Sequence, residues 1–217
     1  MNIHHLEKNN SILNKFIAEI RDEIIQKDSL RFRNNISRIG EILGYELSKH
    51  LTYSTQEVTT CLGTKNINLP NNKIVLCSVL RAGIPLHQGL LNYFDDAESA
   101  FISAYRNHPV NGSKSEIIVE YFAAPSLENK TLLLADPMLA TGQSLIAVYE
   151  AIKKYGNTKE IHLASVIAST EGIECIKNHF PENTHLWIAA IDDELNNKGY
   201  IVPGLGDAGD LAFGSKL

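Results

Sequence analysis

The stretch TLLLADPMLATGQS, residues 131–144, decides the fold of this chain and raises the question of its function. Its apolar run ends abruptly at an acid, Asp136, and a new pattern with helical spacing begins at Ser144, after Thr141 and Gly142. A short apolar run bounded by turn residues is typical of a buried strand, and a 3.6-residue spacing is typical of a helix. A core strand has no structural need for a carboxylate at its tip, so Asp136 is a candidate ligand-binding residue.

Short apolar strands alternate with helical patterns on both sides of this stretch. The predicted strands cover residues 74–80, 99–107, 116–124, 131–138, 161–169 and 184–192. The predicted helices cover residues 11–28, 29–47, 144–155 and 171–180, with Asp28 as a candidate N-cap of the second helix. The alternation predicts one α/β domain over residues 1–217. We expect a mostly parallel sheet covered by helices, a helical N-terminus and one β-hairpin.

Composition and charge restrict the class of protein. With a formal net charge of −5, the chain has no basic cluster of the kind that binds nucleic acid or an anionic membrane. Neither the three cysteines nor the eight histidines have the spacing of a disulfide framework or a metal site. The sequence lacks a signal-peptide pattern and any apolar run of the roughly 20 residues that a membrane helix needs. We therefore expect a cytoplasmic protein in which residues 1–10, with their paired histidines, are flexible.

Three predicted strand ends carry residues that could bind a ligand: Arg81, Arg106 and Asp136. Ligands of parallel α/β sheets bind at this end of the strands. After Asp136, a helix N-terminus would offer unpaired N–H groups and a positive dipole to an anion, with hydroxyl groups from Thr141 and Ser144. The stretch is not a P-loop, because the lysine of that motif is absent. The alternative is an ordinary junction in which Thr141 only caps the helix.

Two other motifs allow both a structural and a functional interpretation. Arg81 and Arg106 together suggest anion binding in an acidic protein, although each alone is typical of a solvated surface charge. The segment GYIVPGLGDAGD, residues 199–210, is either a flexible tail or a rigid loop. Its regular glycines, without Ser or Lys, favour a rigid loop that presents backbone N–H and C=O groups to a planar ligand.

Taken in order, these motifs resemble the uracil phosphoribosyltransferases, which have the type I phosphoribosyltransferase fold. The resemblance runs from Arg21 to Lys216. It implies that uracil and 5-phosphoribosyl 1-diphosphate react to UMP and diphosphate, with Mg²⁺, in pyrimidine salvage. The motifs that carry it are RFR (31–33), LRAG (80–83), YRN (105–107), DPMLATG (136–142) and GYIVPGLGDAGD (199–210).

The resemblance also implies roles for particular residues. The implied catalytic residues are Arg81, Arg106, Asp136 and Asp207. The implied contacts of 5-phosphoribosyl 1-diphosphate are Arg81, Arg106, Asp136, Pro137, Met138, Leu139, Ala140, Thr141, Gly142, Gln143, Ser144 and Asp207. The implied contacts of uracil are Ile201, Gly206, Asp207 and Ala208. Mg²⁺ would be held mainly through the sugar diphosphate, with Asp207 as the protein contact.

Further expectations concern the assembly and its regulation. The resemblance implies a mobile hood over residues 108–122 and a homo-oligomer of two or more subunits. The amphipathic N-terminal helices are candidates for the interface between subunits. GTP activates some relatives, and the sequence leaves open whether it acts here. No nucleic-acid or membrane partner is expected.

Two positions need comment beside the family pattern. Related purine enzymes commonly carry an acid before Thr-Gly, where this chain and the uracil enzymes have Ala140. This fits a base that loses its N1 proton without a strong neighbouring base, so no proton acceptor is assigned. The departure is Gln143, where the family usually has glycine. A right-handed helical backbone would accommodate Gln143, whereas a glycine-only conformation would impair phosphate binding. We expect the helical conformation.

Two other functions compete with this interpretation. A nucleotide-sensing regulator on the same scaffold would bind UMP and RNA, but it would need a basic face that the net charge of −5 disfavours. An enzyme for a different base is disfavoured by GLGDAGD, residues 204–210. Turnover with uracil and retention of RNA at physiological salt would separate the three.

Overall fold

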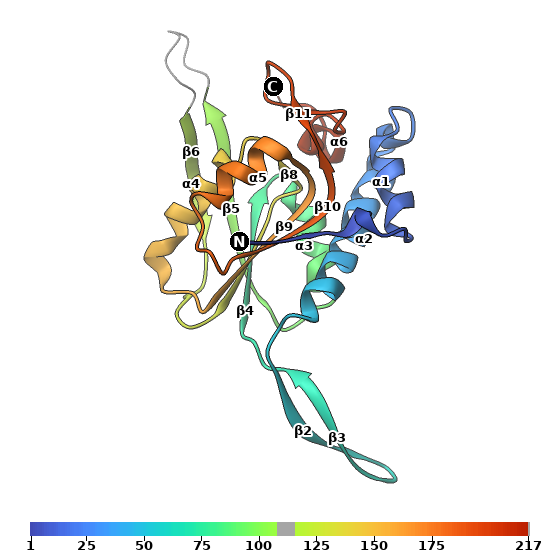
Figure 1. Cartoon of the computed structure of the whole chain (residues 1–217), viewed down its shortest axis with the longest axis vertical. Helices are drawn as coiled ribbons and strands as arrows, with labels where there is room; N and C mark the ends of the chain where they lie inside the picture. The colour runs from blue at the N-terminus through green and yellow to red at the C-terminus, as the bar shows by residue number, and fades with distance from the viewer. Residues whose placement is uncertain (108–115, 217) are drawn as a thin grey trace.

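The computed structural model describes residues 1–107 and 116–216, and its central sheet has the strand order β1-β10-β9-β7-β4-β5-β6 (Figure 1). Neighbouring strands are parallel except β6, which is antiparallel to β5, and the short β8 pairs with β9. The predicted fold class is therefore confirmed, including its hairpin. The strands are β1 (Asn2–His5), β4 (Ile74–Leu80), β5 (Glu98–Asn107), β6 (Glu116–Ala123), β7 (Thr131–Ala135), β8 (Met138–Leu139), β9 (Glu160–Ser169) and β10 (His185–Asp192).

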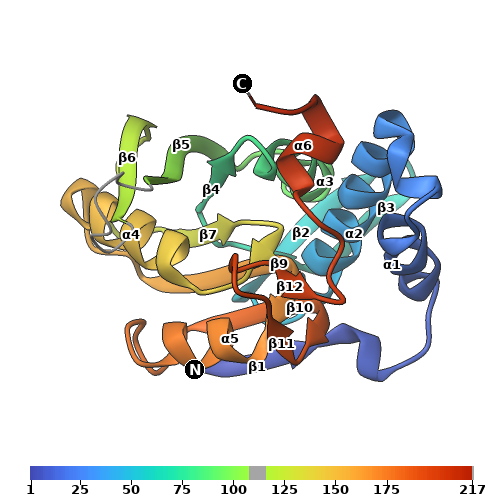
Figure 2. The ribbon, with the colours of Figure 1, turned by 90° about the horizontal axis from the view of Figure 1, so that it is seen from above.

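Helices cover both faces of the sheet, as the view from above shows (Figure 2). Side chains alternate along a strand, so Leu133 packs into the core under one set of helices and Leu134 into the core under the other. No described helix is both long and apolar enough to cross a membrane. The first set comprises α1 (Leu13–Arg21), α2 (Ser29–Ser48), α3 (Gly83–Leu91) and α6 (Ala208–Phe213); the second comprises α4 (Gln143–Ile152) and α5 (Thr170–Lys177).

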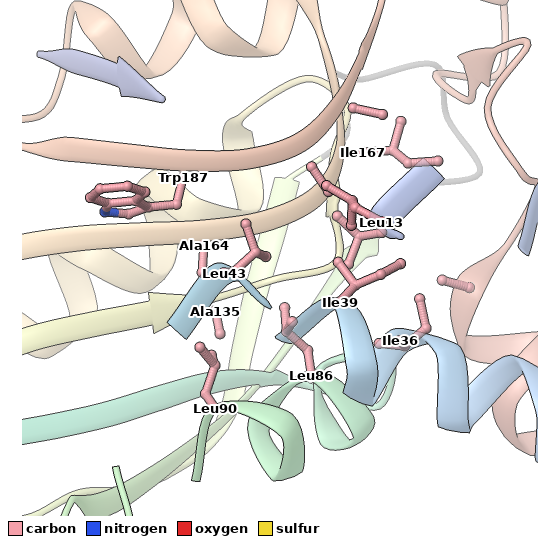
Figure 3. Close-up of a cluster of buried hydrophobic side chains, with 14 of the residues drawn as sticks. Leu13, Ile36, Ile39, Leu43, Leu86, Leu90, Ala135, Ala164, Ile167 and Trp187 are labelled. Carbon is pink, nitrogen blue, oxygen red and sulfur yellow. The ribbon is translucent and has the colours of Figure 1, made fainter. Parts of the chain in front are cut away.

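The apolar stripe of α2 packs into the core. Ile36, Ile39 and Leu43 are buried against the sheet and α3 (Figure 3). The predicted N-cap is confirmed, because the side chain of Asp28 accepts a hydrogen bond from the backbone N–H of Arg31 at 3.1 Å. This stripe is used within the chain, and a contribution of the N-terminal helices to an interface between subunits stays a prediction.

The N-terminus is a correction to the sequence analysis. Residues 1–10 were expected to be flexible, but Asn2–His5 form β1, which pairs in parallel with β10. The ring of His4 stacks on Trp187 with 3.8 Å between centroids. The sequence NIHH has little apolar character, and the strand is formed because β10 offers an open edge of backbone hydrogen-bonding groups.

A second difference is a hairpin that the sequence did not predict. Among the described strands, β2 (Tyr53–Thr60) and β3 (Gly63–Pro70) pair only with each other, and they project away from the body of the molecule (Figure 1). Most of their residues are exposed. Without a buried face, the segment lacks the alternation of apolar and polar residues by which half-buried strands are found. The predicted helix over 11–28 also ends early, at Arg21, and a 3₁₀ turn over Ile25–Lys27 follows it.

Candidate active site

A cavity of about 560 Å³ opens at the carboxyl ends of β4 and β7 and is bordered by α6 and the C-terminal segment. It brings together nine of the residues that the sequence analysis proposed: Arg81, Asp136, Met138, Ala140, Ser144, Ile201, Gly206, Asp207 and Ala208. Five more lining residues lie within the motifs quoted from the sequence: Leu80, Ala82, Gly199, Tyr200 and Gly209. Val79, Ser103 and Lys216 lie outside those motifs.

Asp136 answers the question raised by the opening stretch. It follows the last residue of β7, and its backbone N–H donates to the carbonyl of Ala164 at 3.1 Å. Its Oδ1 accepts from the backbone N–H of Met138 at 3.2 Å. Burial raises the pKa of Asp136 to about 7, against the lowering effect of that hydrogen bond. A buried carboxylate with so little protein compensation favours hydroxyl donors supplied by a ligand.

The loop after Asp136 is held by contacts with β9 and the core. The carbonyl of Pro137 accepts hydrogen bonds from the N–H groups of Val166 and Ile167, and Leu139 is buried in the core. Gly142 has a φ of 77° and caps the N-terminus of α4. The backbone carbonyl of Pro137 and the buried side chain of Leu139 thus anchor the loop.

Gln143 has the right-handed conformation that we expected. It is the first residue of α4, and the positive φ required for the turn falls on Gly142. Its Nε2 donates to Sγ of Cys175 at 3.3 Å, and its side chain is not part of the cavity wall. The departure from the family pattern therefore leaves the backbone of the turn intact.

Two residues of the following α5 region brace this loop and were missed in the sequence. Oγ of Ser169 donates to the carbonyl of Ala140 at 2.5 Å and accepts from the N–H of Gly172 at 2.8 Å. A Cβ on Gly172 would lie 2.2 Å from the carbonyl oxygen of Ala140, so only glycine allows this approach. The sequence does contain a serine N-cap followed three residues later by a glycine. It gives no sign of Ala140, the residue that both contact, because Ala140 lies 29 residues before Ser169.

The opposite wall of the cavity carries a network of charged groups. Nη2 of Arg81 donates to Oδ1 of Asp210 at 3.0 Å and to the carbonyl of Gly214 at 3.1 Å. Asp207 caps α6 by accepting from the N–H of Asp210 at 2.9 Å, and its Oδ2 lies 3.4 Å from Nζ of Lys216. Arginine and lysine side chains therefore lie on one side of the cavity beside the Asp207 carboxylate, an arrangement that suits a diphosphate.

The glycine-rich segment is rigid because α1 and the end of β10 hold it. Arg21 donates from Nη1 and Nη2 to both carboxylate oxygens of Asp192, at 2.7 and 2.8 Å. Nη1 also donates to the carbonyl of Gly204 at 3.0 Å, and the Gly204 N–H donates to Asp192 at 2.9 Å. The Arg33 guanidinium donates to the carbonyl of Ala212 at 2.6 Å, which fixes α6. The first and last parts of the chain thus build one wall together.

Replacing Arg21 with alanine is expected to raise the KM for the ligand that binds at residues 201–208 about ten-fold. It would release Gly204 and leave the buried Asp192 carboxylate without its cation, which costs roughly 3 kcal/mol or more of stability. Steady-state kinetics and thermal unfolding measure the two effects. Arg31→Ala is the matched control, because Arg31 pairs with Glu19 and its side chain is half exposed. Equal effects of both substitutions would contradict the role of Arg21.

Some of the proposed residues lie outside this cavity or outside the described part of the chain. Arg106 lies in β5, and its side chain is outside the described residues. Residues 108–115 of the expected hood are also outside them, so the hood stays a prediction. The residues of the phosphate loop that do not form the cavity wall are Pro137, Leu139, Thr141, Gly142 and Gln143.

The strand-end carboxylate of Asp136, the N-terminus of α4 and the Arg81 guanidinium border one cavity, as the resemblance to the phosphoribosyltransferases predicted. A sequence profile described as uracil phosphoribosyltransferase matches residues 7–215. The chain belongs to the uracil phosphoribosyltransferase family.

Individual relatives agree over the whole chain. The uracil phosphoribosyltransferase of Porphyromonas gingivalis is 50% identical over 217 residues, which cover 100% of both chains. That of Thermococcus gammatolerans is 42% identical over 207 residues, which cover 93% of this chain and 91% of the relative. The solved structure of the AQ2163 protein from Aquifex aeolicus is similar with a TM-score of 0.87 at 29% identity, covering 99% of each chain.

Proposed function

We propose that the protein transfers the phosphoribosyl group of 5-phosphoribosyl 1-diphosphate to uracil, forming UMP and diphosphate in pyrimidine salvage. The observation that carries the proposal is the position of Asp136 and the α4 N-terminus opposite the backbone loop of residues 201–208 in one cavity. The first side suits a phosphorylated ribose, and the second suits a flat base with hydrogen-bonding edges.

In this reaction the bond between C1′ of the ribose and the diphosphate oxygen breaks. The bond between C1′ and N1 of uracil forms, and the N1 proton leaves to solvent. The sugar becomes cationic as diphosphate departs, so the Asp136 carboxylate stabilises the ribose side by charge and by accepting hydrogen bonds from its hydroxyl groups. The 5′-phosphate accepts hydrogen bonds from the N–H groups at the start of α4 and from the hydroxyl of Ser144.

Negative charge on the leaving diphosphate is balanced by Arg81 and Lys216. Among the described residues, both contacts of the Arg81 guanidinium use Nη2, so Nη1 and Nε can bind the diphosphate. Lys216 lies next to Asp207 with its side chain mostly exposed, so it can turn from that carboxylate to a phosphate oxygen.

The base is selected by the backbone of the glycine-rich loop. Ile201 is buried and Gly206 has a φ of 93°, a conformation that turns its peptide groups without a side chain in the way. A fixed set of donors and acceptors rejects cytosine, because its pattern at position 4 is the reverse of uracil's and would leave buried groups unpaired.

The carboxylates of the cavity fit a requirement for Mg²⁺. Asp136 and Asp207 contribute oxygen donors to the same cavity, and Mg²⁺ is commonly held by one or two carboxylates together with substrate phosphates. Asp207 is the residue that we propose to hold the ion. When bound, Mg²⁺ would supply positive charge to the leaving diphosphate.

The deciding experiment mixes the purified protein with uracil, 5-phosphoribosyl 1-diphosphate and Mg²⁺ and follows UMP by chromatography. We expect product from uracil and none from cytosine or adenine, and we expect a chelator of Mg²⁺ to stop the reaction. Absence of UMP while calorimetry shows that the sugar diphosphate binds would point to a sensor, or to an enzyme that needs an activator such as GTP; absence of UMP with GTP present as well would overturn the enzyme. Repeating the assay with GTP tests whether this nucleotide is an effector.

We also propose that the protein is a homo-oligomer and resides in the cytoplasm. The β2–β3 hairpin supports the first proposal, because an isolated two-stranded hairpin is only marginally stable and this one exposes Tyr53, Leu62 and Ile67. A second copy of the chain is the partner that would cover it, which light scattering would detect as a dimer or larger.

The free thiols of Cys61, Cys77 and Cys175 support the proposed location in the cytoplasm, since such thiols persist in a reducing compartment.

A further inference from the structure

Three histidines from distant parts of the chain meet at the amino-terminal edge of the sheet, at the opposite end of the strands from the cavity described above. His4 lies in β1, His185 is the first residue of β10, and His50 lies in the turn after α2. One ring nitrogen of each lies within 4.8 Å of the others. Nε2 of His4 and Nδ1 of His185 are 3.0 Å apart.

The rings rest on a rigid base and are open on one side. His4 stacks on the buried Trp187, whose Nε1 donates to Nδ1 of His162 at 3.1 Å. The exposed ring of His50 lies edge-on to His4, with 4.8 Å between centroids. Among the described residues, the His50 imidazole has ring contacts and no hydrogen bond. The cluster thus has two ordered rings, one adjustable ring and access to solvent.

The donor set matches a borderline transition metal. In a tetrahedral zinc site with Zn–N bonds of about 2.0 Å, the ligand nitrogens are about 3.3 Å apart. The His4–His185 separation is close to that value, and a movement of roughly 1.5 Å by the exposed His50 ring would bring in the third. Imidazole nitrogens select Zn²⁺ and its neighbours over Mg²⁺.

We propose that His4, His50 and His185 bind a Zn²⁺-class transition-metal ion, with water as the fourth ligand. Binding requires both facing nitrogens to be unprotonated, so the ring that donates in the His4–His185 hydrogen bond carries its proton on its other nitrogen instead. For His185 this nitrogen is Nε2, and the side-chain amide of Asn2, whose Nδ2 lies 3.5 Å away, would turn its oxygen toward it to accept that proton. The ion would join β1 and the end of α2 to β10, and it would do so independently of the transferase reaction.

Cobalt is the probe for this site, because tetrahedral Co²⁺ has visible absorption bands and spectroscopically silent Zn²⁺ can displace it. The full chain is prepared without a polyhistidine tag and titrated with Co²⁺. We expect absorption that saturates at one equivalent and disappears when Zn²⁺ is added. Zn²⁺ in excess of its Kd is expected to raise the Tm by several degrees, since it binds the folded chain preferentially.

Two variants assign the signal to particular residues. His50→Ala should weaken Co²⁺ binding more than about ten-fold, and the exposed position of His50 means that its fold is retained, which circular dichroism checks. His179→Ala is the matched control: it is an exposed histidine next to Cys175, and it removes that pair as a competing site. The proposal is overturned if the parent shows no saturable binding, if His50→Ala binds equally well, or if His179→Ala loses the signal.

Discussion

Replacement of Asp136 by asparagine is expected to lower kcat/KM for UMP formation by about 10²–10³-fold. Asparagine has the same shape and can still accept the hydrogen bond from the Met138 N–H. It lacks the negative charge that stabilises the cationic sugar and binds the ribose hydroxyl groups. The loss should therefore appear in both the affinity for 5-phosphoribosyl 1-diphosphate and the chemical step.

The same substitution is expected to make the protein more stable at alkaline pH. Burial raises the pKa of Asp136 from an ordinary value of 3.8 to about 7. Because the folded-state pKa is raised, the stability linked to the protonated form is fully present below pH 3.8 and is lost as the pH rises to 7. Above pH 7 the charged, buried carboxylate lowers the free energy of unfolding by at most about 4 kcal/mol, because a pKa difference of one between the folded and unfolded states corresponds to about 1.4 kcal/mol. Asp136→Asn removes that cost.

Thermal unfolding at pH 5 and pH 8, with steady-state kinetics, tests both parts of this prediction. The difference in Tm between variant and parent should be positive at both pH values and clearly larger at pH 8 than at pH 5. Asp96→Asn is the control, because Asp96 is exposed and away from the cavity, and neither measurement should respond to it. A variant with a lower Tm at pH 8 and unchanged affinity for the sugar diphosphate would show that Asp136 has a structural role.

The parts of the fold and site that the sequence predicted share one property: their signal is local. The β7 strand, the acid at its end and the start of α4 are adjacent in the chain, so their apolar pattern and turn residues are enough to place them. Gln143 could be interpreted in the same way, because it is the first residue of α4, where a right-handed helical backbone accommodates any side chain, and the positive φ of the turn falls on Gly142.

The parts that were missed depend on partners far away in sequence. Arg21 and Asp192 are 171 positions apart, and nothing in either segment indicates the other. The NIHH strand becomes regular only because β10 is beside it, and strand propensity depends on such context. The histidine cluster was invisible for the same reason, since its members at 4, 50 and 185 have no metal-site spacing along the chain.

Replacement of Gly172 by alanine is the second change with a large expected effect. Helix propensity alone predicts that it stabilises the protein, whereas the surrounding contacts predict that it destabilises it. Gly172 lies inside α5 with an ordinary helical φ, where alanine is normally favoured by up to about 1 kcal/mol. The added Cβ would, however, be 2.2 Å from the carbonyl oxygen of Ala140 and 2.7 Å from that of Leu139. Backbone atoms cannot rotate away as a side chain can, so either the phosphate loop or α5 must move.

We expect Gly172→Ala to lower the free energy of unfolding by about 2–3 kcal/mol, the cost of overpacking, despite its better helix propensity. Displacement of the loop that binds the 5′-phosphate should lower kcat/KM for 5-phosphoribosyl 1-diphosphate by roughly 10²-fold. Denaturant unfolding and kinetics with each substrate varied in turn measure these effects. Affinity for the base should change less, because residues 201–208 are held by Arg21 and Asp192 instead.

Gly44→Ala is the matched control for this prediction, because it is also a glycine inside a helix. A Cβ there would meet its nearest neighbours in Leu90 and Phe94 at 3.5 Å, an ordinary contact distance. The control should leave kinetics unchanged and stability equal or slightly higher. If Gly172→Ala behaves like Gly44→Ala, the close approach of α5 does not position the phosphate loop. The contact of α5 with Ala140 holds the loop in place if Gly172→Ala loses activity, Ser169→Ala loses part of its activity and Gly44→Ala keeps its activity.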